Sequence, residues 1–69
     1  MTEVFRTNVD CKDAAMQLLN LLWKSFPHGM INFDLEDCDK ILRVEAISFN
    51  PNEIIHLLKK EGYQCEILE

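Results

Sequence analysis

Apolar and polar residues alternate in four short stretches of this chain and recur at helical spacing in two longer ones. Alternation is the pattern of half-buried strands, and it marks residues 3–9, 30–35, 40–47 and 63–68. Helical spacing marks residues 11–26 and a second helix that starts at Pro51. The pattern predicts six elements in the order strand, helix, strand, strand, helix, strand.

Residues at the ends of the two helices support this division. Asp10 is a suitable N-cap for the first helix, and Pro27 and Gly29 end it. Asn50 caps the second helix, which begins with a proline. That helix ends at Gly62, since glycine readily adopts the left-handed backbone that closes a helix.

The order of the elements predicts a single α+β domain, residues 1–69, with a ferredoxin-like βαββαβ fold. A right-handed crossover from the first strand to the second leaves a gap that the third strand fills. The strands then form an antiparallel sheet in the order 4-1-3-2, with both helices on one face. On the open face, an apolar patch is predicted from Val4, Met30, Ile41 and Leu68.

Composition and charge narrow the range of partners. Apolar residues make up 48% of the chain, which is typical of a folded domain. Seven basic and twelve acidic residues give a net charge of -5, which argues against binding to nucleic acid or to an anionic membrane surface. The sequence has neither a membrane-spanning apolar run nor the pattern of a signal peptide, so we expect a cytoplasmic protein.

Three cysteines carry most of the candidate chemistry. An odd number of cysteines without a Cys-x-x-Cys pair does not suggest a disulfide framework, so reduced thiols are expected. Cys11 starts the first helix, where it is either a metal or redox thiol or the first member of the apolar stripe. Cys38 lies in an acidic turn at the same end of the predicted fold as Cys11. It is either a second ligand beside Cys11 in a mixed zinc site with Asp37 and Asp39, or an exposed turn residue. Cys65 is expected in the core.

A resemblance to a known family rests on several segments. The hairpin contains Phe33-Asp34-Leu35-Glu36 and Leu42-Arg43-Val44-Glu45, the second helix begins Asn50-Pro51-Asn52-Glu53-Ile54-Ile55, and Lys60-Glu61-Gly62-Tyr63 precedes the last strand. In this order and spacing they resemble the heavy-metal-associated domain, the fold of copper chaperones and of metal-pump N-terminal modules. The resemblance covers nearly the whole chain and implies the same ferredoxin-like fold.

That family binds Cu(I) through a Met-x-Cys-x-x-Cys loop after the first strand, because two soft thiolates suit a soft ion. The matching stretch here is Val9-Asp10-Cys11-Lys12-Asp13-Ala14. Cys11 matches the first cysteine, but Val9 replaces the methionine and Ala14 the second cysteine. The resemblance therefore implies an incomplete metal loop with Cys11 as its remaining ligand. Tyr63 matches the residue beside the metal in bacterial members; a tyrosine at the edge of the core is the alternative.

Catalysis has little support in the sequence. Ser25 and Ser48 lie outside any Gly-x-Ser-x-Gly elbow, no glycine-rich phosphate loop is present, and a chain of 69 residues offers no deep pocket. His28 and His56 have no partner at ligand spacing and are expected in solvent. We therefore expect a protein that is not an enzyme.

Two functions remain open at this point. The first is an interaction module of the heavy-metal-associated type, which needs no cofactor and docks an unknown protein partner or a second copy through its helices, sheet face or edge strands. The second is a soft-metal protein or metallochaperone that binds Cu(I) or zinc through Cys11, with a second copy supplying another sulfur.

Overall fold

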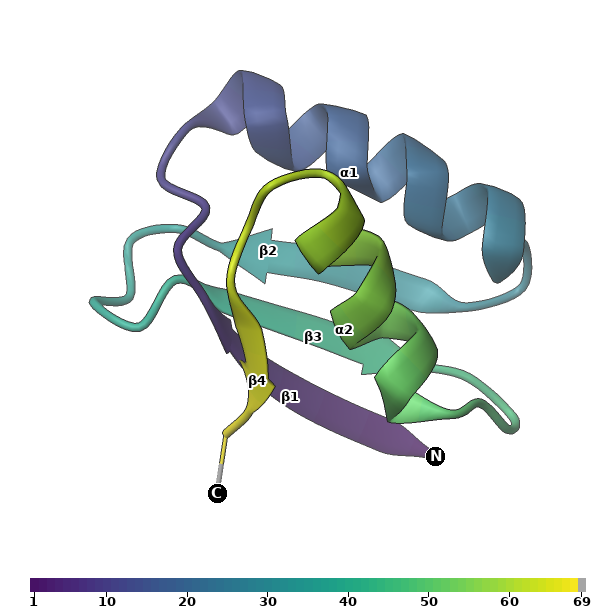
Figure 1. Cartoon of the computed structure of the whole chain (residues 1–69). Helices are drawn as coiled ribbons and strands as arrows, with labels where there is room; N and C mark the ends of the chain where they lie inside the picture. Colours follow the sequence, from purple (N-terminus) through teal and green to yellow (C-terminus); the bar gives the residue numbers. More distant parts are fainter. Residues whose placement is uncertain (69) are drawn as a thin grey trace.

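The computed structural model describes residues 1–68 and contains the predicted elements in the predicted order. They are β1 (Thr2–Thr7), α1 (Lys12–Ser25), β2 (Met30–Asp34), β3 (Ile41–Glu45), α2 (Pro51–Lys60) and β4 (Cys65–Ile67). In Figure 1 the two helices cover one side of the sheet. Neither helix is long and apolar enough to cross a membrane.

The four strands form one antiparallel sheet in the order β2-β3-β1-β4, which reads β4-β1-β3-β2 from its other edge. The middle strands are β3 and β1, and the edges are β2 and β4. This arrangement of two helices on a four-stranded sheet is an α+β architecture consistent with a ferredoxin-like fold.

The core lies between the helices and the facing side of the sheet. Alternate strand residues point into it, as the two-residue period of a strand requires, and meet one stripe from each helix. The largest fully buried side chains are Phe5, Val9, Leu18, Leu22, Leu42, Val44, Ile54 and Leu58. Burial of an aliphatic or aromatic side chain of this kind contributes about 1.5–3 kcal/mol, so this cluster is the main source of stability.

Several elements are shorter than the sequence pattern predicts. β1 ends at Thr7, and Val9, which the pattern placed in the strand, enters the core from the following loop. Helix α1 has Cys11 as its N-cap, so the prediction of Asp10 was wrong. Residues 63 and 64 lie before β4, which starts at Cys65.

The apolar patch predicted on the open face is interrupted by charged residues. Ile41 is only 6% exposed and lies opposite Arg6 on β1 and Asp34 on β2. Met30 is exposed, but it lies on the edge strand opposite Glu45. This face therefore lacks the continuous apolar surface that self-association through it would need.

Candidate functional site

The direction of the backbone groups on β2 follows from the pairing of β1 with β3. The amino group of Met1 donates to the carbonyl oxygen of Ala46 at 2.7 Å, and the Ala46 N–H donates to the Met1 carbonyl oxygen at 2.9 Å. In an antiparallel ladder, residues that face one neighbouring strand alternate with residues that face the other. Since Ala46 faces β1, Glu45 and Arg43 turn their backbone groups toward β2.

The same alternation leaves backbone groups of β2 without a neighbouring strand. Met30 and Asn32 lie opposite Glu45 and Arg43, so their N–H and C=O groups are used in the pairing with β3. The N–H and C=O groups of Ile31 and Phe33 point away from the sheet, and no strand among residues 1–68 pairs with them. They form an open hydrogen-bonding edge while their side chains face the helices.

An apolar groove runs beside this edge. Helix α1 lies along β2 (Figure 1), and a hollow of about 540 Å³ is lined by both elements, including Met16, Leu19, Phe33 and Leu35. A second hollow of about 290 Å³ is lined by Trp23 and residues 29–32. Because the two hollows share Asn32 and Arg43, they follow the strand along its whole length.

The helical wall of the groove is a second apolar stripe on α1. Met16, Leu19 and Trp23 are spaced by three and four residues, which places them on one flank of the helix. Met16 is 54% exposed and Trp23 is 41% exposed, and on the strand Met30 is 71% exposed. We call this surface the β2 edge groove, defined by Met16, Leu19 and Trp23 of α1 and by residues 30–35.

Charges of both signs surround the β2 edge groove. Its lining includes Lys12 and Arg43 together with Asp34, Glu36 and Glu45. A mixed set of this kind favours neither a small anion nor a small cation. The free backbone groups and the apolar wall instead suit an extended polypeptide, which binds through main-chain hydrogen bonds and alternate side chains.

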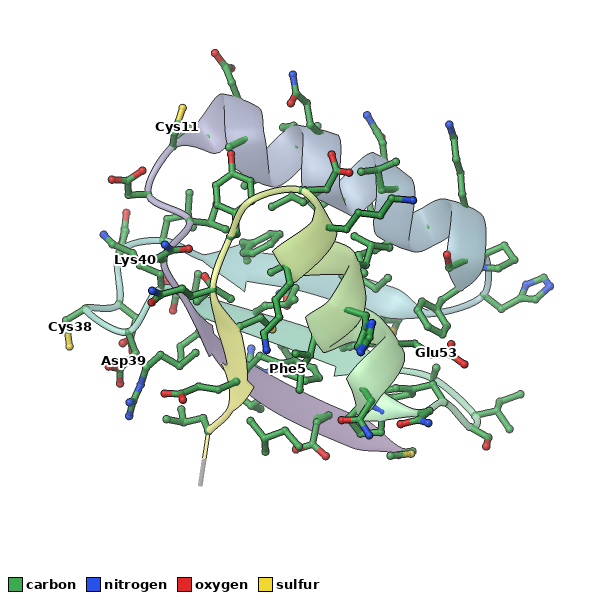
Figure 2. The ribbon with its side chains drawn as sticks, viewed as in Figure 1. Phe5, Cys11, Cys38, Asp39, Lys40 and Glu53 are labelled. Atoms are coloured by element: carbon green, nitrogen blue, oxygen red, sulfur yellow. The ribbon has the colours of Figure 1, made fainter. Side chains whose placement is uncertain are left out.

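The three cysteines do not form a common site. Cys11 and Cys38 are exposed, and Figure 2 shows their sulfur atoms on different loops, pointing away from each other. The exposure of Cys11 shows that the alternative prediction of a packed residue at the start of the apolar stripe was wrong. Cys65 is buried, as predicted, and burial together with the charge of Glu66 raises the pKa of its thiol to about 12.

The acidic turn between β2 and β3 brings several possible metal ligands together. One ligand atom from each of Asp37, Cys38 and Asp39 lies within 4.8 Å of the others. Both carboxylates already make contacts: Asp37 Oδ1 accepts the Asp39 N–H at 2.9 Å, and Asp39 Oδ1 lies 3.4 Å from Nε of Arg6. These contacts give both carboxylates a role in holding the turn itself. Among residues 1–68, Cys11 belongs to no such group.

The remaining candidates from the sequence have ordinary surroundings. Tyr63 is half-buried and packs against the core, and His28 and His56 are exposed, as predicted. The β2 edge groove was not predicted from the sequence, because it depends on which strand lies beside the flank of α1 that carries Met16 and Trp23. The signal that could have found it is the apolar surface of α1, which is wider than the one face that packs against the core.

Comparison of the chain with protein-family models, with curated proteins and with solved structures found no match in any of the three.

Proposed function

We propose that this protein is a non-enzymatic interaction module that binds an extended polypeptide segment in the β2 edge groove. In this proposal the scaffold is of the heavy-metal-associated type, with an incomplete metal loop at Cys11. The observation that carries the proposal is the coincidence of free backbone groups at Ile31 and Phe33 with the apolar flank of α1.

The energetics of such binding follow from the composition of the groove. An added strand exchanges hydrogen bonds with Ile31 and Phe33, each contributing about 0.5–1.5 kcal/mol net. Side chains on one face of the added strand cover Met16 and Trp23, and each square ångström of apolar surface removed from water contributes about 25 cal/mol. Ordering the bound segment opposes these terms, so we expect weak to moderate affinity rather than a permanent complex.

A library of random peptides displayed on phage tests the proposal, since it samples many extended segments at once. We expect selected peptides to alternate apolar and polar residues and to shift the amide NMR signals of Ile31 and Phe33 and the side-chain signal of Trp23. Met16→Asp should weaken their binding by about tenfold, because it places a charge in the apolar wall. Gln17→Asp, on the solvent side of the same helix, is the matched control and should leave binding unchanged.

Two results would contradict the proposal. One is a selection in which the recovered peptides shift signals on α2 or β4 and leave those of β2 unchanged. The other is equal binding to the wild-type protein and the Met16→Asp variant, since the groove would then have no part in recognition.

A further inference from the structure

We propose that the β2 edge groove binds the same groove of a second copy, with the two β2 strands paired antiparallel about a two-fold axis at Asn32. The proposal deepens the proposed function by naming the partner, and it rests on the same groove. A symmetric contact of this kind requires that the surface be complementary to itself. The backbone pattern and the facing side chains each meet that requirement.

The hydrogen-bonding pattern of β2 fits this pairing. With Asn32 opposite Asn32 of the second copy, Ile31 lies opposite Phe33 of that copy, and Phe33 lies opposite its Ile31. These are the residues whose backbone groups point away from the sheet, so each pair exchanges N–H···O bonds in both directions. The sheets of the two copies join into one continuous sheet.

The side chains that meet in this register are compatible on both faces. On the helix face, each Ile31 meets a Phe33, an aromatic and β-branched pair that stabilises antiparallel strands. On the open face, the two Asn32 amides meet at the axis and each Asp34 meets a Met30. No like charges lie opposite each other within the strand.

The exposed apolar residues of the groove are covered in the same contact. The two-fold axis is perpendicular to the joined sheet, so both α1 helices lie on one face and their Met16, Leu19 and Trp23 flanks line the junction. The exposure of Met16 and Trp23 is thereby explained by the helix side of the contact, whereas Met30 lies on the open face opposite Asp34 of the other copy. The opposite edge of the sheet fits less well, because β4 has only three residues. Its Glu66 carboxylate also already forms an ion pair with Arg6 at 3.0 Å.

Net charge predicts how this association responds to salt. Each copy carries -5, so the two copies repel each other at long range. Screening shortens that repulsion to about 8 Å at physiological ionic strength, and further at higher salt. The dimer should therefore tighten as salt is added, whereas a dimer held by surface ion pairs would weaken.

A charge-exchange experiment at the axis tests the register. Asn32 is exposed, so Asn32→Lys and Asn32→Asp should both fold, which circular dichroism checks. By analytical ultracentrifugation we expect a dimer for the wild type and about a tenfold or greater loss of dimer affinity for each variant alone, because like charges meet at the axis. An equimolar mixture should recover the dimer and shift the emission of Trp23, the single tryptophan, to shorter wavelength. Gln17→Lys and Gln17→Glu are controls that should stay dimeric.

The outcomes separate this inference from the proposed function. A wild type that stays monomeric at all accessible concentrations overturns the self-pairing, as do variants that remain dimeric alone or fail to recover when mixed. If a monomeric wild type still binds library peptides at Ile31 and Phe33, the interaction module stands and only the second copy as partner is wrong. If the dimer forms through Asn32, peptides selected on the wild type should compete with it for the same edge.

Discussion

Thr7 donates its side-chain hydroxyl to the carbonyl oxygen of Lys40 across 2.7 Å, although the two residues are 33 positions apart in the chain. The same hydroxyl oxygen accepts the N–H of Val9 at 3.2 Å. Thr7 is only 7% exposed, and Lys40 has a backbone φ of 49°, in the left-handed region. One buried hydroxyl therefore joins the end of β1, the loop that leads to α1 and the turn between β2 and β3.

Replacing this hydroxyl tests how much it stabilises that end of the molecule. Thr7→Val keeps the shape of the side chain but leaves the buried Val9 N–H without its acceptor. We expect the free energy of unfolding in urea to fall by about 1–3 kcal/mol, the cost of an unsatisfied buried polar group. Thr2→Val, at the exposed start of β1, is the matched control and should change stability little. Equal stability of the two variants would show that water replaces the lost partner.

Most of the fold could be predicted because the relevant signals are local. The period of two residues in a strand and of 3.6 residues in a helix can be recognised from neighbouring residues. The end of α2 is likewise set by a local residue, Gly62. The end of β1 was misplaced because it depends on Thr7 and Lys40, which lie far apart in the sequence. Alternation continues through Val9, and only the tertiary hydrogen bonds show that the strand has already ended.

The candidate site was less predictable for the same physical reason. The burial of Cys65 followed from its place on the inward face of a strand, which is a local pattern. The β2 edge groove combines a flank of α1 with β2, which is a separate element of the chain. The open backbone groups of β2 depend in turn on the pairing of β1 with β3. No pattern within one segment of the chain contains that information.

Cys11 offers a direct way to stabilise α1. Its backbone is extended, with φ -129° and ψ 134°, which is the conformation of an N-cap, but its side chain makes no capping hydrogen bond. Cys11→Ser supplies a hydroxyl that accepts an N–H from the first turn, so we expect a gain of about 0.5–1 kcal/mol in urea unfolding. Cys38→Ser, in the turn between β2 and β3, is the matched control. A loss of stability in Cys11→Ser would mean that the thiol makes a contact of its own.

The same variant tests the alternative function of soft-metal binding. One thiolate supplies too few donors to hold Cu(I) or zinc selectively, so we expect the reduced wild type and Cys11→Ser to bind either ion equally weakly in a competition titration. Tight binding that the variant loses, with one ion for every two copies, would support a metal carrier in which two Cys11 thiolates share the ion.

Gly62 ends α2 with a backbone φ of 96°, a conformation that L-residues rarely adopt. No heavy atom lies within 4 Å of the position that a Cβ would occupy, so substitution strains the backbone without causing a clash. We expect Gly62→Ala to lower the free energy of unfolding by about 1 kcal/mol, and Gly62→Asn to cost less, because asparagine tolerates the left-handed region better. Thermal unfolding of the two variants checks this order. Equal losses would contradict this order, because the cost would then not depend on how well the new residue tolerates the left-handed region.

The buried thiol of Cys65 should make stability depend on pH in the alkaline range. Its pKa is raised from 9.0 to about 12, chiefly by burial and further by Glu66. Below pH 9 the thiol is protonated in both the folded and the unfolded chain, and its contribution is fully present. As pH rises from 9 toward 12, the unfolded chain loses the proton first, so the folded state is progressively destabilised.

Urea unfolding of the reduced protein between pH 8 and pH 11 measures this effect, with the range chosen to span the interval from the unfolded pKa of 9.0 toward the folded value. Once the unfolded thiol is ionised, the slope should approach about 1.4 kcal/mol per pH unit more than that of Cys65→Ala, which lacks the group. Cys65→Ala corrects for every other effect of pH on stability in the same range. Identical slopes would mean that Cys65 ionises as readily in the folded chain, and an aromatic disulfide reagent would then label it in the native state alongside Cys11 and Cys38.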